Sequence, residues 1–458
     1  MQKIFQVPVT PIEQFTLDNG LRVVLNEDHS VPVVSVAVYY DVGSRNEREG
    51  RTGFAHLFEH MMFQGSENVP KAAHFQYVSN AGGTMNGTTS SERTNYFQTL
   101  PANQLPLALW LESDRMRSLS VTQENLDNQR EAVKEEKRLR YDNQPYVNGF
   151  LRLFEMSFKN PANAHSTIGS MEDLDAATVE DIQEFFRIYY APNNAVLSLA
   201  GDFDRAEAQK LIEKYFATIP RQPEPPPVDV SEPDEVAQTR DIFVDKLAPV
   251  PAFAIGWKIP PRRTPDCYAL SLASNLLFEG ESARLYQKLV KGEESVVQIQ
   301  GGLDERRGPS GLFIVVIPKP DRDGVQIRES LLREIHDLAS AGPSTEEMEK
   351  LRNNLFNGSV RGRQSSIFRA QQLAEFALYD GDPELFNTDL ENYLSVTPAQ
   401  IRDAVARHLD TDNRVLLEIV PGPLEAAAEP AAPPAPGEPK QPTAPPAPSF
   451  PVAQESKL

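Results

Sequence analysis

Residues 178–199 of this chain read TVEDIQEFFRIYYAPNNAVLSL: a polar start, a helical run, a polar turn and a short apolar stretch. The same order returns without a gap at residues 397–419, TPAQIRDAVARHLDTDNRVLLEI. Matching residues occupy equivalent places in the two copies: Thr178/Thr397, Ile182/Ile401, Asn194/Asn413, Val196/Val415 and Leu197/Leu416. This repeat indicates an internal duplication, in which each half is a sheet covered by helices.

Strand patterns at the start of each half support the duplication. They occupy residues 21–25 and 33–40 in the first half, and residues 240–244 and 252–257 in the second. Together with long helical patterns they predict an α+β fold class, with two homologous domains that are each a mostly antiparallel sheet covered by helices. We expect a lead-in at 1–11, a first domain at 12–220, a Pro- and acid-rich linker at 221–238, a second domain at 239–422 and a Pro/Ala-rich tail at 423–458.

The composition of the tail predicts an extended or disordered spacer, or a docking ligand for a partner that binds proline-rich segments. The whole chain has a net charge of −20 and no Lys/Arg cluster, which argues against nucleic acid as a partner. Its acidic excess favours basic peptides or simply aids solubility.

Cys267 is the only cysteine, so a disulfide within the chain and a cysteine zinc site are both excluded. We expect it to pack as a small hydrophobic residue. The first twenty residues lack a continuous apolar region, and no apolar run reaches about 18 residues. We therefore expect no signal peptide and no membrane span in a cytoplasmic protein, or a periplasmic one if a leader was removed.

The residues that carry chemistry are His56-Leu57-Phe58-Glu59-His60. On a helix, His56 and His60 lie one above the other and can aim both imidazoles at one metal ion. Glu59 points to the same side and can hold a water against that metal as a general base. This H-x-x-E-H order is that of the inverzincins and predicts one Zn²⁺ per chain. The alternative is an ordinary helix with two surface histidines.

A catalytic zinc site takes a third protein ligand and keeps its fourth position for water. Residues 122–140, TQENLDNQREAVKEEKRLR, are typical of a charged helix. Its candidate carboxylates are Glu124, Asp127, Glu131, Glu135 and Glu136. Spacing alone does not choose among them, because most must form a solvated face.

The motif, followed downstream by R-E-x-V-x-E-E, resembles the pitrilysin/insulinase family of zinc peptidases, which includes the mitochondrial processing peptidase. Further matches extend from about residue 12 to residue 422, and they include Leu17-Asp18-Asn19-Gly20, Gly53-Phe54-Ala55, Met61-Met62-Phe63-Gln64-Gly65, Pro192-Asn193-Asn194 and Gly201-Asp202. The resemblance implies two domains that form one half of a clamshell, and it places the third zinc ligand at Glu136.

Residues 82–90, GGTMNGTTS, alternate small and apolar residues and predict an exposed edge strand to which an extended peptide adds. A glycine-rich hairpin is the alternative. The resemblance implies that Asn86 and Gly87, where the family has Asn-Ala, contact the substrate beside the scissile bond. Phe63 would wall a pocket next to the metal, although such an aromatic is more often part of the core. Gln129 stands where the family usually has an acidic residue, a departure that would lower metal affinity or rate.

The second half departs further from the family. In catalytic assemblies of the family an Arg and a Tyr come from the other bowl of the clamshell, in a stretch like L-R-E-x-x-G-x-A-Y. The corresponding residues 289–297, LVKGEESVV, contain neither, and we expect Arg284 and Tyr286 upstream to pack instead. The missing pair and the chain length imply an obligate dimer, with a heterodimer with a homologous zinc-less subunit favoured over a homodimer.

These observations predict a zinc-dependent endopeptidase that hydrolyses unfolded peptides inside a closed dimeric chamber, with Glu59 as general base. Three alternatives stay open: a zinc-bearing subunit that needs the Arg and Tyr of a partner, a non-catalytic structural subunit, and a module that binds peptides without cutting. The other histidines lack ligand spacing and are interpreted as surface or packing residues: His29, His74, His165, His336 and His408.

Overall fold

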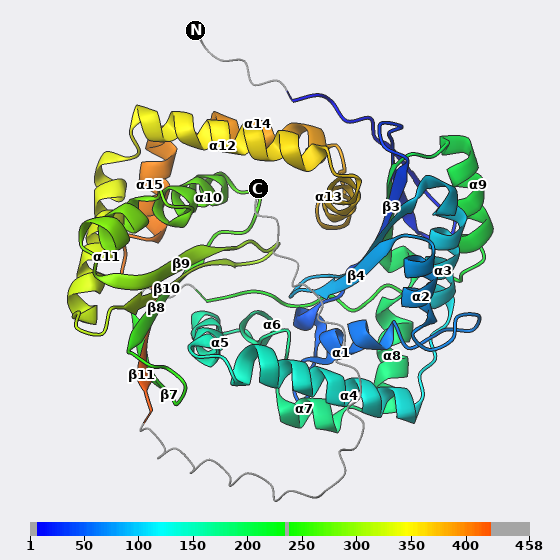
Figure 1. The fold of residues 1–458 in the computed structure, drawn as a ribbon, viewed down its shortest axis with the longest axis horizontal. Coiled ribbons are helices and arrows are strands. Elements are labelled where there is room, and N and C mark those ends of the chain that lie inside the picture. The colour runs from blue at the N-terminus through cyan, green and yellow to red at the C-terminus, as the bar shows by residue number, and fades with distance from the viewer. Residues whose placement is uncertain (1–6, 234–237, 423–458) are drawn as a thin grey trace, which may run out of the picture.

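The computed structural model describes residues 7–233 and 238–422, and its framework is two β-sheets on opposite sides of the molecule (Figure 1). The first sheet has six strands, in the order β1-β2-β6-β3-β5-β4: β1 (Glu13–Thr16), β2 (Arg22–Glu27), β3 (Val33–Tyr40), β4 (Thr84–Thr89), β5 (Thr94–Pro101) and β6 (Ala195–Gly201). The second has five, in the order β7-β11-β8-β10-β9: β7 (Thr239–Asp245), β8 (Ala252–Ile259), β9 (Val296–Asp304), β10 (Ser310–Pro318) and β11 (Val415–Pro421).

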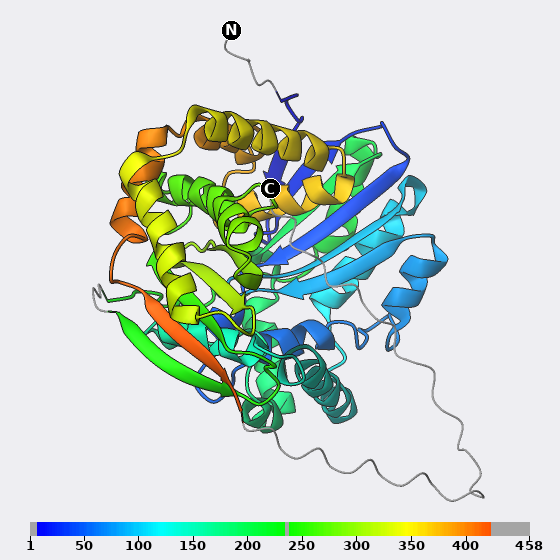
Figure 2. The ribbon, with the colours of Figure 1, turned by 60° about the vertical axis from the view of Figure 1, so that its left-hand side comes forward.

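Each sheet contains one parallel pair of strands, β2–β6 in the first and β7–β11 in the second. Figure 2 shows the second of these pairs, with β11 in orange beside β7 in green. All other pairs are antiparallel. Apart from β1, the two strand orders correspond place by place. The expected fold class, α+β with two homologous and mostly antiparallel sheets covered by helices, is confirmed.

Helices cover both sheets. The first half contributes α1 (Phe54–Met61), α2 (Ala73–Asn80), α3 (Leu105–Arg117), α4 (Gln123–Lys137), α5 (Val147–Ser157), α6 (Pro161–Ala164), α7 (Met171–Ala176), α8 (Val179–Tyr189) and α9 (Arg205–Phe216). The second contributes α10 (Pro265–Phe278), α11 (Gly324–Ala341), α12 (Thr345–Arg363), α13 (Ser366–Tyr379), α14 (Leu385–Ser395) and α15 (Pro398–His408). Short π-helical turns occupy Arg138–Asp142 and Tyr286–Gly292, and 3-10 turns occupy Ser44–Asn46, Ala102–Gln104 and Pro192–Asn194.

The repeated stretches form equivalent elements. Thr178 and Thr397 stand at the N-caps of α8 and α15, and each accepts a backbone hydrogen bond within a capping box. Ile182 and Ile401, one turn further on, are both fully buried. The apolar stretches that follow become β6 and β11, which occupy the same place in their sheets. The same local chemistry therefore builds the same unit twice.

The two halves exchange one helix each. α5 of the first half packs on β7, β8 and β11, and α13 of the second half packs on β2, β3 and β6 (Figure 1). A Cβ at Gly149 of α5 would lie 2.6 Å from Cδ1 of Ile419, so glycine permits this close approach. The face of α13 buried on the first sheet is made of small and apolar residues: Ala370, Leu373, Ala374 and Ala377. Each sheet therefore completes its core with a helix from the other half. The domain limits expected from the sequence stay a prediction.

Residues 221–233 run without helix or strand. They are nevertheless held in place, because the buried Glu232 carboxylate accepts the backbone N–H groups of Lys159 at 2.8 Å and Asn160 at 3.0 Å. Cys267 is buried in α10, as expected. The tail expected at 423–458 lies outside the described residues. Within residues 7–233 and 238–422, no helix combines the length and apolar character that crossing a bilayer requires.

Candidate metal centre

The helix α1 carries the H-x-x-E-H motif. Its first residue is fixed by the conformation of Gly53 and by hydrogen bonds from the backbone to Glu47. Gly53 precedes it with φ +80°, and a Cβ there would lie 2.5 Å from the carbonyl oxygen of Ile168. No side chain at the N-cap serves the first N–H groups. Instead the carboxylate of Glu47 accepts from the backbone N–H of Gly53 at 3.0 Å and of Ala55 at 2.7 Å.

The two faces of α1 have different surroundings. Its apolar side chains, among them Leu57, Phe58 and Met61, are buried in the core of the first half. Because residues four apart share a face, this burial leaves His56 and His60 together on the face that meets α4 (Figure 1). Their rings lie edge to face with centroids 4.8 Å apart.

Glu136, near the end of α4, completes the group. Its Oε2 atom lies 3.6 Å from Nε2 of His56 and 3.3 Å from Nε2 of His60. One ligand atom from each of the three residues lies within 4.8 Å of the others, and no other His/Cys/Asp/Glu group in the described residues meets that criterion. The structure therefore brings together Glu136, and none of the other carboxylates of α4, with the two histidines.

The charges of this group suit a divalent metal. Burial, with the charge of His60, lowers the pKa of His56 to about 3, so this imidazole is neutral and able to ligate at neutral pH. Burial alone would raise the pKa of Glu136, but hydrogen bonding to His60 and nearby positive charge lower it to about 2. Two imidazoles and one ionised carboxylate are the donors of a catalytic zinc site that keeps a fourth position open.

Two further residues contact these ligands. Gln129 lies two turns before Glu136 on α4, and its side chain is near enough to the ring of His60 to contribute to the rise in the pKa of that histidine. Burial lowers the pKa of His60, but the bond to Glu136 and the negative charges of Glu59 and Glu136 outweigh burial, and the net pKa is raised. Arg140, in the π-helical turn after α4, pairs with Oε1 of Glu136 at 2.7 Å. Sequence reasoning missed Arg140, although its spacing of four residues from Glu136 was a signal.

Glu59 lies beside this group and is 8% exposed. The hydroxyl of Thr89, the last residue of β4, donates to Oε2 of Glu59 at 2.6 Å. Burial raises the pKa of the Glu59 carboxyl, while the charge of His60 and the Thr89 bond oppose that shift. The contact with Thr89 had no signal in the sequence, since the two residues are thirty positions apart.

The strand β4 lies at the edge of the first sheet and pairs with β5 alone among the described strands. Asn86 and Gly87 lie within it, and a Cβ at Gly87 would stand 3.1 Å from Oε1 of Glu59. The open strand edge and the carboxylate are therefore adjacent. Phe63, just after α1, is half-buried and packs against the rings of Phe75 and Tyr96 at 4.8 and 5.6 Å.

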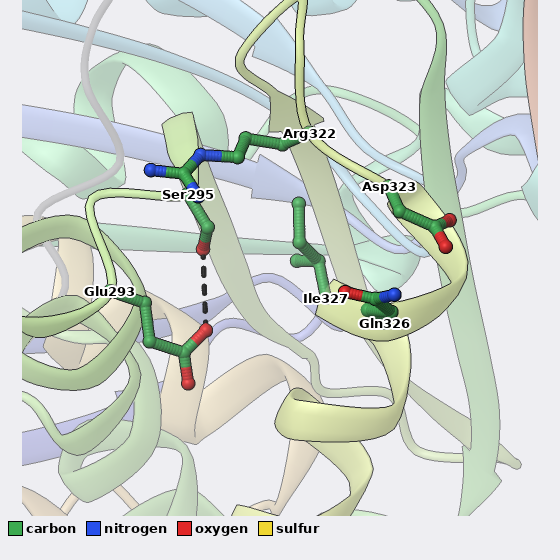
Figure 3. A pocket seen from close by; sticks show the side chains of 6 residues that line it. All are labelled: Glu293, Ser295, Arg322, Asp323, Gln326 and Ile327. Atoms are coloured by element: carbon green, nitrogen blue, oxygen red, sulfur yellow. Dashed lines mark hydrogen bonds between the residues drawn. The ribbon is translucent and has the colours of Figure 1, made fainter.

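In the second half, residues 289–297 span the end of a π-helical turn and the start of β9. Arg284 upstream pairs with Glu334 and Glu347, and Tyr286 contacts Lys291, so both pack within that half as expected. Two residues of this segment help to line a cavity of about 330 Å³. Figure 3 shows the side chains around it: Glu293, Ser295, Arg322, Asp323, Gln326 and Ile327. None of these residues belongs to the candidate site.

The remaining histidines lie outside the metal group. His29, His165, His336 and His408 contact carboxylates, and His74 is buried.

Two family models match most of this chain. The model described as Insulinase (Peptidase family M16) matches residues 22–166, and the one described as Peptidase M16 inactive domain matches residues 176–355. The chain belongs to the insulinase family of peptidases, the pitrilysin/insulinase family that its motifs indicated.

Particular relatives agree with this class. The zinc protease PqqE of Helicobacter pylori is 28% identical over 368 residues, which cover 80% of this chain and 83% of that protein. The crystal structure of a protease from Helicobacter pylori matches with a TM-score of 0.87 and 25% identity, covering 90% of this chain and 100% of that one. The probable mitochondrial-processing peptidase subunit beta of Arabidopsis thaliana is 25% identical over 275 residues, 60% of this chain and 51% of that protein.

Proposed function

We propose that this chain is a zinc-dependent endopeptidase that hydrolyses unfolded peptides. His56, His60 and Glu136 would hold the metal, and Glu59 would act as general base. The observation that supports this most is that the three candidate ligand atoms lie within 4.8 Å of one another. Beside them is the buried Glu59, which contacts the edge strand β4 through Thr89. The candidate metal donors, the candidate base and an edge strand that could bind a peptide are thus neighbours in one half of the chain.

The chain's own residues divide the chemistry between them. When bound, zinc supplies a Lewis acid for the scissile carbonyl and acidifies water. An extended peptide adds to the free edge of β4 through backbone hydrogen bonds, with Asn86 and Gly87 beside the scissile bond. Glu59 accepts a proton from the attacking water and delivers it to the leaving amine. Thr89 occupies Oε2 of that carboxylate, which leaves Oε1 to carry the proton.

The chain would work as one half of a closed chamber in the cytoplasm. Residues 289–297 contain neither the Arg nor the Tyr of catalytic relatives, which favours a heterodimer with a homologous zinc-less subunit over a homodimer. That a relative is named as subunit beta of a peptidase supports this arrangement. A chamber of two such halves would admit unfolded chains and exclude folded proteins.

The test is cleavage of a quenched-fluorescent mixture of unstructured peptides by the zinc-loaded chain and by its Glu59→Gln variant. The variant keeps the size of the side chain and should retain about one zinc per chain and peptide binding, while cleavage is lost. Glu124→Gln is the matched control, because this glutamate is 89% exposed at the start of α4.

The outcomes separate the candidate functions. Turnover that is lost in Glu59→Gln and kept in Glu124→Gln supports a self-sufficient peptidase. Zinc and peptide binding without turnover supports either a zinc-bearing subunit that needs the Arg and Tyr of its partner or a module that binds peptides without cutting. Absence of both zinc and peptide binding would contradict all three and favour a structural subunit.

A further inference from the structure

Arg307 lies at the tip of the β9–β10 hairpin, which reaches from the second sheet towards the first (Figure 1). Its guanidinium donates to the two carboxylate oxygens of Asp41 at 3.0 and 2.5 Å. Its backbone N–H donates to the Glu92 carboxylate at 3.0 Å, and its side chain donates to the carboxylate and carbonyl of Glu92 at 3.4 and 3.3 Å. The guanidinium also lies over the ring of Tyr379 at 4.5 Å. One residue of the second half thus holds two acidic residues of the first.

Glu92 belongs to the turn that joins β4 to β5. The turn closes through the Ser90 N–H, which donates to the Arg93 carbonyl at 2.9 Å. The Glu92 side chain is 5% exposed and pairs with Arg45 as well as with Arg307. The backbone N–H of Arg45 also donates to the carbonyl of Ser91 at 3.0 Å. The turn is therefore held by its own half on one side and by Arg307 on the other.

The same turn sets the end of the edge strand. Thr89, whose hydroxyl binds Glu59, is the residue next to the turn. Arg93, within the turn, donates to the hydroxyl of Thr88 at 2.6 Å. Since β4 has a paired strand on one side only, its backbone register depends on β5 and the turn, while α1 and α2 pack against it. A displacement of about 1 Å at a reacting group can cost on the order of a hundredfold in rate.

We propose that Arg307 is a positioning residue for the β4–β5 hairpin, through which the second half of the chain holds the substrate strand and the Thr89–Glu59 bond in register with the metal ligands. Its action on the reaction rests on the proposed peptidase function. Its action on the hairpin does not, and can be measured without turnover.

The test compares three variants of the full zinc-loaded chain. Arg307→Gln removes the guanidinium, and Glu92→Gln weakens the same contact from the opposite side. Arg369→Gln is the matched control, because Arg369 also joins the halves, to Asn26 at 2.7 Å and Asp28 at 2.6 Å. Those residues lie at the end of β2, which β6, β3 and β5 separate from β4.

Two readouts are taken. Backbone amide exchange in residues 84–95 should quicken about tenfold in Arg307→Gln and in Glu92→Gln, and stay unchanged in Arg369→Gln. For peptide cleavage, KM should rise and kcat fall in the first two variants, so that kcat/KM drops at least about tenfold, while the control keeps its kcat/KM. Zinc stoichiometry should be the same in all.

The outcomes are distinct for the two proposals. Unchanged exchange of the hairpin in Arg307→Gln, or equal quickening in Arg369→Gln, would overturn the role of Arg307. A wild-type chain that shows no turnover, with the exchange difference present, would count against the self-sufficient peptidase and leave the positioning role standing. If Arg307→Gln does not fold, Arg307→Lys, which keeps the charge but not the paired contact with both carboxylate oxygens of Asp41, decides the role of Arg307 by the same measurement.

Discussion

The ring of His165 contacts the buried carboxylate of Glu47 at 2.8 Å, and that carboxylate accepts hydrogen bonds from the backbone N–H groups of Gly53 and Ala55 at the start of α1. The other ring nitrogen of His165 lies 2.6 Å from the carbonyl oxygen of Pro161. Both nitrogens therefore face acceptors, which suits an imidazolium. A histidine without ligand spacing thus supports the start of α1 through Glu47, which lies nine residues before His56 in the chain.

This pair makes stability depend on pH. Burial lowers the pKa of His165, but the hydrogen bond and charge of Glu47 outweigh burial, and the net pKa lies above its ordinary 6.5. A pKa raised in the folded state contributes stability that is fully present below about pH 6.5 and is lost as pH rises through the raised value. Burial also raises the pKa of Glu47, which acts in the same direction.

We therefore expect His165→Gln to lower the free energy of unfolding by about 2 kcal/mol at pH 6, the value typical of a hydrogen bond to a charged group. Above the raised pKa the difference from wild type should shrink. Chemical denaturation at several pH values between 6 and 9 measures it. A constant difference across that range would contradict the expected titration of His165.

Zinc should stabilise the chain through its three ligands. At a free zinc concentration one hundred times the dissociation constant, binding adds about 2.7 kcal/mol to the free energy of unfolding. Thermal unfolding with zinc and with a chelator should therefore differ in wild type, and not in His60→Ala. Glu131→Gln, at an exposed carboxylate on the same helix as Glu136, should keep the full response. A zinc response in His60→Ala would contradict the assigned ligand set.

Thr89→Val should lower kcat, because the substitution keeps the shape of the side chain and removes the hydroxyl that binds Glu59. A hydrogen bond to a charged group is worth about 1.5–3 kcal/mol, so a loss of roughly ten- to a hundredfold in kcat/KM follows. Thr89→Ser keeps the hydroxyl and should restore most of the activity. Steady-state cleavage of one fluorogenic peptide by the three proteins is sufficient, and an active Thr89→Val would remove Thr89 from the mechanism.

Gln129→Glu should raise zinc affinity by about tenfold, since a carboxylate that hydrogen-bonds a ligating imidazole makes it a better donor than an amide does. Competition with a chromophoric chelator measures the dissociation constant. Gln123→Glu, at the exposed first position of the same helix, adds the same charge away from His60 and should leave the affinity unchanged. Equal gains in both variants would indicate a general effect of charge.

Local patterns were sufficient for the parts of this chain that local physics controls. The threonine caps, the buried isoleucines one turn later and the apolar strands repeat in both halves, and they predicted the duplicated α+β fold. The spacing of His56 and His60 predicted a shared helix face for the same reason, since a helix repeats every 3.6 residues. Family resemblance, rather than spacing, selected Glu136 among the carboxylates of α4.

The sequence by itself determined which segments become helices and strands, and which side chains can share a face, because these follow from contacts a few residues apart. Only the tertiary structure decided the hydrogen-bond partners of Glu59 and Glu47. It also decided that α5 and α13 pack on the sheet of the other half, and that Arg307 binds Glu92. These contacts join residues far apart in the chain, and they arise from how apolar faces and buried charges are satisfied once the elements pack.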